Sequence, residues 1–244
     1  MPQGKFHPYE NDVRVPFMIR GPGIFSESSV RDDIVATHVD VMPTLLGLID
    51  GGVHGSVSIP STMDGRNLAK DLLNAGRRGH DGVANIESSS VSPPSTKTNG
   101  DLSIVLIEYI GLGDVIRYQH LEDSYNNTFR ALRILDQRQP PPPLPPQQPV
   151  PRQRQRRRNL KYIEFTNCQT DWNFTKEPAE LELFDLDDDP YELTNIIHTV
   201  PDDLLVQLQR ITRNLFRCRG ETCRNALLEA SLDWDTTTTT TAEQ

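Results

Sequence analysis

Alternating and periodic apolar positions predict a short series of strands and helices along this chain of 244 residues. The apolar run Val13–Ile19 stops at Gly21-Pro22-Gly23, which predicts a strand followed by a tight turn. Residues 37–49 predict a helix, because Thr37 or Asp40 can cap its start and the leucines that follow form one apolar face.

The later apolar segments predict a sheet and a second long helix. The near-continuous apolar run Ser103–Tyr109 predicts a buried strand, and residues 125–135 and 161–165 would pair as a hairpin. Alternation in Glu180–Leu186 predicts a half-buried strand, and the leucine spacing in Asp202–Phe216 predicts an amphipathic helix. This order of elements is typical of α/β structure in the first hundred residues and of α+β structure afterwards.

Three polar stretches interrupt the pattern and lower the hydrophobic content to 36%. Residues 88–100 predict a polar loop, and the threonines of 236–241 predict a disordered tail. Residues 137–159 are rich in proline and arginine and predict a disordered surface insertion at the tip of the hairpin. The alternative is an interaction segment, whose prolines dock into an SH3- or WW-type groove and whose arginines contact acidic partners or RNA.

Net charge and cysteine content limit the classes of protein to which this chain can belong. The formal net charge of −9 argues against a general nucleic-acid binder, and no apolar run approaches the roughly 20 residues of a membrane-spanning helix. The first residues show no signal peptide, which taken literally predicts the cytosol. The sequons at Asn126 and Asn173 favour glycosylation on a secretory route instead. Cys218 and Cys223 could form a disulfide or stay as two thiols. A disulfide between them would leave Cys168 as the third, unpaired cysteine of the sequence.

The candidate chemistry lies near the N-terminus. Gly4-Lys5 is followed at fixed spacing by Tyr9-Glu10, Arg14-Val15-Pro16 and Arg20-Gly21-Pro22-Gly23. This arrangement resembles the segment after the metal-binding loop of sulfatases, where the lysine reaches the sulfate group. Cleavage of a sulfate ester develops negative charge on oxygen, and a positioned ammonium group offsets that charge. The resemblance therefore implies that Lys5 is a sulfate-binding catalytic residue.

His7 has two interpretations. Gly-Lys-Phe-His is also similar to a second sulfatase motif, in which the lysine and the following histidine both face the active site. The continuation through Tyr9 and Glu10 favours the first motif, so His7 is not expected to be catalytic. Glu10 and Arg14 are expected to hold the loop through an ion pair or hydrogen bonds.

Three later segments extend the resemblance. Residues 39–46 look like the helix opening that follows in sulfatases, and Asp64-Gly65-Arg66-Asn67-Leu68 looks like their next loop. Residues 182–196 are similar to a strand and turn of their C-terminal domain. The acidic run 185–189 lacks the alternating ligand positions and central glycine of an EF-hand, so a turn is expected there rather than a calcium loop.

N-acetylglucosamine-6-sulfatases are the sulfatases that the chain resembles most. The resemblance rests on residues 107–109, on residues 123–128 and on the cysteine pair within 218–224, in this order. It implies hydrolysis of sulfate esters of glycosaminoglycan sugars, with a sulfated glycosaminoglycan or a small sulfate ester as partner and no nucleic acid. It also implies a lysosomal or secreted location for the full-length enzyme.

The resemblance implies an α/β fold of the alkaline-phosphatase-like type. Residues 1–87 would form the end of its catalytic domain, residues 101–225 a smaller α+β subdomain, and residues 226–244 a tail. Sulfatases use calcium and a formylglycine made from the cysteine of a C-x-P-S-R motif, and none of the three cysteines begins such a motif. The chain is therefore expected to be the C-terminal portion of a sulfatase, truncated before Met1 and inactive alone.

Overall fold

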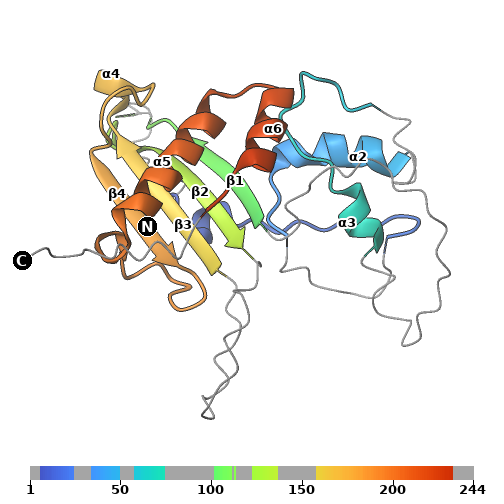
Figure 1. Cartoon of the computed structure of the whole chain (residues 1–244), viewed down its shortest axis with the longest axis horizontal. Helices are drawn as coiled ribbons and strands as arrows, with labels where there is room; N and C mark the ends of the chain where they lie inside the picture. Colours follow the sequence, from blue (N-terminus) through green and yellow to red (C-terminus); the bar gives the residue numbers. More distant parts are fainter. Residues whose placement is uncertain are drawn as a thin grey trace, which may run out of the picture. The chain divides into compact units, whose positions relative to one another are not determined.

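The computed structural model describes residues 6–24, 34–49, 58–74, 102–111, 113, 123–136 and 158–232. Lys5, the polar loop 88–100, residues 233–244 of the tail and most of the Pro/Arg-rich segment lie outside the described residues, whereas residues 226–229 of the predicted tail belong to a helix. The chain divides into two compact units, coloured along the sequence in Figure 1. One unit takes its residues from 1–15, 101–216 and 230–244, and the other from 16–100 and 217–229. The domain division expected from the sequence stays a prediction.

The first unit is built on a four-stranded antiparallel sheet of order β1-β2-β3-β4. Its strands are β1 Leu102–Tyr109, β2 Thr128–Asp136, β3 Arg158–Thr166 and β4 Glu180–Asp185. The predicted strands and the predicted hairpin of β2 and β3 are therefore confirmed. β3 starts earlier than predicted, because Arg158 and Asn159 pair with Asp136 and Leu135, so these two residues belong to the sheet rather than to the insertion.

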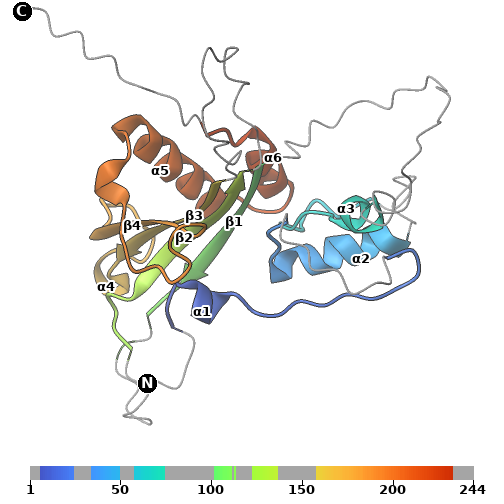
Figure 2. The ribbon, with the colours of Figure 1, turned by 90° about the horizontal axis from the view of Figure 1, so that it is seen from below.

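Two layers cover this sheet, and Figure 2 shows the helices α5 and α1 on its opposite sides. Helix α5, Asp202–Arg217, confirms the predicted amphipathic helix and buries its apolar stripe, whose members are Leu204, Leu208, Ile211 and Leu215. The other face holds the core cluster of Phe129, Ala131, Ile163, Phe184 and Leu186. Tyr9 packs against this cluster, next to the short helix α1, Glu10–Val13.

Short elements complete the first unit. Helix α4, Cys168–Asp171, follows β3 directly, and Asn167 caps it by accepting the backbone N–H of Gln169. The 3-10 helix η3, Ile197–Thr199, lies between β4 and α5. Phe174 of the segment after α4 packs against Phe216 of α5, with 5.4 Å between the ring centroids.

The second unit contains the 3-10 helix η1 His38–Asp40 and the helices α2 Val41–Ile49, α3 Ala69–Asn74 and α6 Glu221–Glu229. η1 and α2 confirm the predicted helix over 37–49. The Asp40 carboxylate accepts the backbone N–H of Thr37 at 3.1 Å and so caps its start.

The strand predicted over Val13–Ile19 is absent. Glu10–Val13 form α1 instead, and residues 14–20 run without ladder pairing. A strand needs a neighbouring backbone to pair with, and the described residues provide none here, while Pro16 has no N–H to donate. The described part of the first hundred residues holds no strand, and α/β structure in this region stays a prediction. The mixed α and β composition is confirmed, and the alkaline-phosphatase-like fold stays a prediction.

Candidate functional site

The segment that directly follows Lys5 is held against the sheet by a buried lysine. Lys161 of β3 is 0% exposed, and its ammonium group donates to the carbonyl of Pro8 at 2.7 Å. The same nitrogen lies 2.7 Å from Glu10 Oε1 and 3.2 Å from Glu192 Oε1. Lys161 therefore links the N-terminal segment to the turn after β4.

Glu10 is the second centre of this ion network. Its backbone N–H donates to Glu192 Oε2 at 2.6 Å, and its side chain accepts from Arg133 Nε at 3.2 Å. Burial alone would raise the pKa of Glu10, but the ion pairs with Lys161 and then Arg133 outweigh it and lower the pKa. The pKa of Glu192 is raised, chiefly by burial. The expectation that Glu10 holds this loop by an ion pair agrees with these contacts.

Hydrogen bonds from aromatic and amide groups add to this anchoring. The Tyr9 hydroxyl donates to the Glu182 carboxylate at 3.3 Å, and burial, followed by the charge of Glu182, raises the pKa of Tyr9 to about 12. Asn127 Nδ2 donates to the carbonyl of Phe6 at 2.8 Å and to Asp123 Oδ1 at 3.0 Å. Residues 6–10 thus meet the turns before β2 and after β4, which are segments that carry the family resemblance.

An open cavity of about 580 Å³ lies beside this segment in the first unit. Phe6 and His7 line one side of it. The rest of the lining comes from the turn before β2 and from the facing ends of β3 and β4: Asp123, Ser124, Asn126, Asn127, Phe165, Thr166, Ala179 and Glu180. The described lining combines the rings of Phe6, His7 and Phe165 with carboxylate, amide and hydroxyl groups.

The His7 side chain is exposed and lines the open cavity, so it is not part of a buried site. Its ring stacks against Tyr9, with 6.2 Å between the ring centroids. Its backbone N–H donates to Asp12 Oδ2 at 3.0 Å. That His7 takes no catalytic part stays a prediction.

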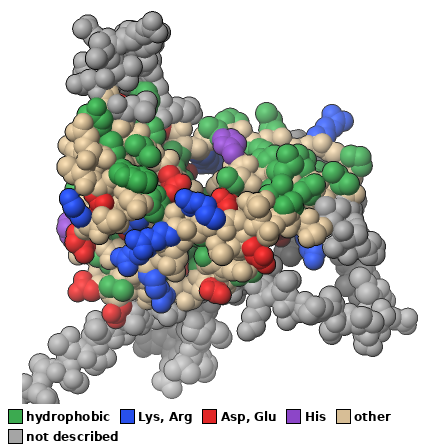
Figure 3. All heavy atoms as spheres, turned by 90° about the horizontal axis from the view of Figure 1, so that it is seen from above, with side chains coloured by type: hydrophobic (Ala, Val, Ile, Leu, Met, Phe, Trp, Pro, Cys, Tyr) green, Lys and Arg blue, Asp and Glu red, His purple; other side chains and the backbone are tan. Residues whose placement is uncertain are grey.

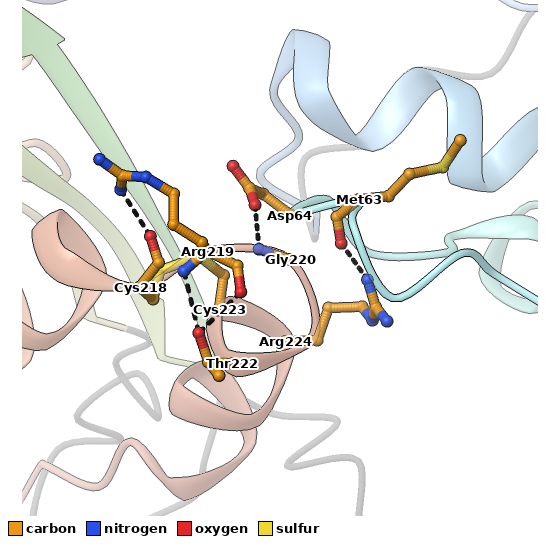
Figure 4. The surroundings of a disulfide bond; sticks show 8 residues. All are labelled: Met63, Asp64, Cys218, Arg219, Gly220, Thr222, Cys223 and Arg224. Carbon is orange, nitrogen blue, oxygen red and sulfur yellow. Dashed lines mark hydrogen bonds between the residues drawn. A yellow bond between two sulfur atoms is a disulfide. The ribbon is translucent and has the colours of Figure 1, made fainter.

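A disulfide joins Cys218 and Cys223 in the second unit, which is the pair singled out in the sequence. Figure 4 shows the small loop that it closes. Within this loop, the backbone N–H of Gly220 donates to the Asp64 carboxylate, so the loop is tied to one of the segments that resemble sulfatases.

The backbone of the disulfide loop also approaches Ser61 closely. The N–H of Glu221 donates to the Ser61 carbonyl at 2.7 Å. Gly220 has a φ of 59°, and a Cβ there would lie 2.0 Å from the Ser61 carbonyl oxygen. Only glycine therefore fits this close approach.

The same unit contains a second set of contacts between segments that resemble sulfatases. Asp40 is 3% exposed, and its Oδ1 accepts the backbone N–H of Arg66 at 2.7 Å. Its Oδ2 lies 3.0 Å from the Arg66 guanidinium. The backbone N–H of Leu68 donates to Thr44 Oγ1 at 3.1 Å. The segments 39–46 and 64–68 therefore contact each other.

The buried charges of the sheet were not predicted from the sequence. Besides Lys161, Arg130 of β2 pairs with Glu164 of β3 at 2.5 Å, with side chains 4% and 0% exposed. The Arg130 guanidinium also lies over the Phe174 ring, 4.4 Å from its centroid. Burial, opposed by Arg130, raises the pKa of Glu164. The sequence feature that could have indicated these buried charges is a charged residue at an inward-facing position of a mostly apolar strand.

Both predicted glycosylation sites are exposed. Asn126 Oδ1 accepts from Asn167 Nδ2 at 2.6 Å, and Asn126 also lines the cavity. Asn173 precedes Phe174, which has a φ of 50° and is buried. The Thr175 hydroxyl of this second sequon donates to Asp171 Oδ1 at 2.7 Å. Glycosylation at either asparagine stays a prediction.

The acidic run after β4 forms a turn. Asp185 accepts the backbone N–H of Asp187 at 3.1 Å, and Asp189 accepts that of Thr194 at 2.7 Å. Across the described ranges, no group of three or more His, Cys, Asp or Glu side chains could hold a metal ion. The described residues therefore provide no ligand set for the calcium that the resemblance implies. No helix in the described part of the chain could cross a membrane.

Known proteins similar to this chain are sulfatases. It is 24% identical to an N-acetylglucosamine-6-sulfatase of Bos taurus over 231 residues, which cover 92% of this chain and 33% of that protein. It is 28% identical to an arylsulfatase of Volvox carteri over 225 residues, which cover 91% of this chain and 28% of that protein. A stretch of 75 residues, 31% of this chain, is 43% identical to an extracellular sulfatase SULF-1 homolog of Drosophila melanogaster.

These similarities confirm the resemblance to sulfatases. The chain spans about a third of the length of the N-acetylglucosamine-6-sulfatase that it matches. No family model matches the chain.

Proposed function

We propose that this chain supplies a sulfate-binding lysine, Lys5, and the sheet that supports it, to a site that hydrolyses sulfate esters. The observation that carries the proposal is the anchoring of residues 6–10 by Lys161 and Glu192. The segment that follows Lys5 is therefore held by buried charges rather than left as a solvated arm. The similarity to sulfatases over nine tenths of the chain supports the same role.

In this proposal Lys5 binds an oxygen of the sulfate group. Negative charge grows on the oxygens of a sulfate ester as the S–O bond breaks, and a fixed ammonium group stabilises it. A fixed donor costs less reorganisation than a mobile one, because its position is settled before the reaction. Glu10, Lys161 and Glu192 contribute indirectly, by holding residues 8–10, which follow Lys5 in the sequence.

The proposed substrate is a sulfate ester of a glycosaminoglycan sugar. The support is the similarity to N-acetylglucosamine-6-sulfatases, together with the cysteine pair 218 and 223. None of the three cysteines lies in a C-x-P-S-R motif, so the nucleophile would have to come from outside this sequence. The chain by itself would then bind a sulfate ester without turning it over.

We further propose a secretory route for the protein. The disulfide and the two exposed sequons are features of oxidising, glycosylating compartments. One of the similar proteins is named an extracellular sulfatase.

The test measures sulfate release and sulfate-ester binding by the natural protein that carries this sequence, produced in its own host cells with each substitution introduced. Lys5→Ala should lower kcat/KM for N-acetylglucosamine 6-sulfate about 100-fold, because one electrostatic donor to the transition state is lost. Lys70→Ala, which removes an exposed lysine of α3, is the matched control and should leave kcat/KM unchanged.

An assay of the isolated 244-residue chain shows whether the chain hydrolyses sulfate esters by itself or only binds them. Titration with p-nitrophenyl sulfate should show binding that Lys5→Ala abolishes, without release of sulfate. Turnover by the isolated chain would refute the assignment of the nucleophile to residues outside this sequence. Binding that survives Lys5→Ala unchanged would overturn the role of Lys5.

A further inference from the structure

We propose that Asn126 carries an N-linked glycan and that the first sugar of this glycan occupies the open cavity beside Phe6 and His7. The inference rests on the proposed secretory route, because N-glycans are attached in the secretory pathway. It goes beyond that route by assigning an occupant to the cavity. Asn126 belongs to a sequon and also lines the cavity, so a sugar attached to it starts at the cavity wall.

The contacts of Asn126 leave its attachment atom available. An N-glycan is joined to the amide nitrogen, Nδ2. The other amide atom, Oδ1, accepts from Asn167 Nδ2 at 2.6 Å, and no described residue accepts a hydrogen bond from Asn126 Nδ2. The backbone N–H of Asn126 donates to Ser124 Oγ at 3.1 Å. The exposed side chain is therefore held in place while its acceptor nitrogen stays unengaged.

The attachment is a group transfer from a lipid-linked diphosphate oligosaccharide. Asn126 Nδ2 forms a bond to C1 of the first N-acetylglucosamine and gives up one proton. The bond from C1 to the diphosphate oxygen breaks, and the lipid diphosphate leaves with its electron pair. Thr128, the third residue of the sequon, is 0% exposed, and its hydroxyl donates to the Tyr125 carbonyl at 3.0 Å. The sequon is therefore accessible to a transferase before β2 pairs, so the transfer precedes folding.

The size and lining of the cavity suit the first sugar of a glycan. Its volume of about 580 Å³ falls within the range of pockets for small molecules, roughly 300–1,000 Å³. A sugar ring has an apolar C–H face that can pack on aromatic surface, which Phe6 and Phe165 provide. Its hydroxyl and amide groups need polar partners, which the exposed side chains of His7 and Glu180 offer.

The charge of the lining favours an uncharged occupant that donates hydrogen bonds. Asp123 and Glu180 are carboxylates, and the described lining holds no lysine or arginine. An anionic ligand would therefore meet like charge at short range, which is unfavourable. The sugars nearest the asparagine of an N-glycan are uncharged, and their hydroxyl groups can donate to carboxylates. The lining thus suits a glycan better than an anion.

The cavity wall and the glycan are both fixed before they meet. The Asp123 carboxylate accepts from the Tyr109 hydroxyl at 2.7 Å and from the backbone N–H of Ser124 at 2.8 Å. The Asn127 amide links the same carboxylate to the Phe6 carbonyl. A sugar tethered to the wall binds at a high effective concentration, so weak contacts are enough to hold it.

Peptide mass mapping of the natural protein, produced in its own host cells and trimmed with an endoglycosidase, tests the attachment. The peptide that contains Asn126 should retain one N-acetylglucosamine after trimming. Modification of Asn173 without modification of Asn126 would overturn this inference and leave the secretory route standing. A protein that is unmodified at both sequons would overturn this inference and also count against the secretory route.

Amide hydrogen exchange tests whether the sugar lies in the cavity. In protein from the glycosylating host, Asn126→Gln should quicken exchange at residues 123–127 about tenfold, because the wall loses its covering sugar. Asn173→Gln removes the sequon that does not line the cavity and should leave this exchange unchanged.

Protein made in a host that adds no N-glycans separates the glycan from the substitution itself. There Asn126→Gln should change exchange at residues 123–127 by less than about twofold, since exposed substitutions alter stability little. An equal change with and without the glycan would show that the glycan points away from the cavity. The absence of any change in the glycosylated protein would overturn the assignment in the same way.

Discussion

At the scale of single residues, Lys161 lies on β3 with no exposed surface, and its partners come from Pro8, Glu10 and Glu192. Removing two carboxylates and an ammonium group from water is costly, and their mutual attraction must offset that cost. The contacts therefore stabilise the native arrangement only while every partner is present. A change at one position leaves a buried charge without compensation.

Lys161→Met should lower the free energy of unfolding by about 3–5 kcal/mol, because Glu10 and Glu192 keep their charge and lose their shared cation. Chemical denaturation measures the change. Lys176→Met removes an exposed lysine and should change the stability by less than about 0.5 kcal/mol. Equal stabilities of Lys161→Met and the wild type would show that the network does not hold the segment.

The pH dependence of stability should report the same network through Glu10. Its folded pKa lies below the ordinary value of 4.5, so its ionised form stabilises the fold above that value. This contribution is lost as the pH falls through the lower folded pKa. The stability difference between the wild type and Glu10→Gln should therefore shrink as the pH falls from about 7 to about 3. Denaturation curves measured across this range provide the test, and a constant difference would contradict it.

At the scale of elements, local patterns predicted the sheet well and its charges poorly. Period-two alternation and apolar runs identify β1 to β4, and leucine spacing identifies α5, because both patterns follow from local geometry. The partners of Lys161 could not be predicted, since Glu10 and Glu192 lie 182 residues apart in sequence. The strand prediction at 13–19 failed because strand formation depends on a partner, which a local pattern does not contain.

The candidate site was predictable only in part. Lys5 came from a family pattern and lies outside the described residues, and the cysteine pair came from its spacing. The cavity depends on Phe6, Asn126 and Glu180 meeting at one end of the sheet. That meeting follows from strand order and register, which no single segment of sequence specifies.

The disulfide loop should stabilise the segment that it contacts. Cys218→Ser with Cys223→Ser removes the closure of a short loop and should cost about 2 kcal/mol. Amide hydrogen exchange should then quicken at residues 60–64, where the Ser61 carbonyl and the Asp64 carboxylate accept hydrogen bonds from the backbone of the loop. Cys168→Ser is the control and should leave exchange at 60–64 unchanged.

Gly220→Ala tests the contact between the disulfide loop and residues 60–64, and it leaves the Cys218–Cys223 disulfide in place. A Cβ at Gly220 would collide with the Ser61 carbonyl, so exchange at 60–64 should quicken even with the disulfide intact. Gly21→Ala places its Cβ at an ordinary 3.6 Å from Ile24 and serves as the matched control. Slow exchange in Gly220→Ala would show that the loop does not hold this segment.

At the scale of the whole molecule, the exposed apolar surface contrasts with the net charge of −9. Figure 3 shows hydrophobic side chains gathered on the surface over the α2 region. Met42, Leu45 and Ile49 recur at helical spacing along α2 and are 54%, 44% and 79% exposed. Contiguous apolar surface of this kind favours association.

The isolated chain should therefore self-associate in a way that depends on concentration and strengthens with salt. Screening weakens the repulsion between negatively charged chains, while apolar contacts persist. Met42→Glu with Ile49→Glu should restore the monomer in sedimentation velocity. Met18→Glu, at a residue that is 91% exposed and outside α2, adds negative charge away from the stripe and should leave association largely intact. A wild-type chain that stays monomeric at high salt would contradict the prediction.

The contact of Glu10 with Glu192 also imposes an order in time. During synthesis Glu10 leaves the ribosome 182 residues before its partner exists. At about 5–20 residues per second, roughly 10–40 s pass before this contact can form. Arg133 and Lys161 are synthesised earlier and can contact Glu10 first, so the hydrogen bond from the Glu10 backbone to Glu192 completes the network late in folding.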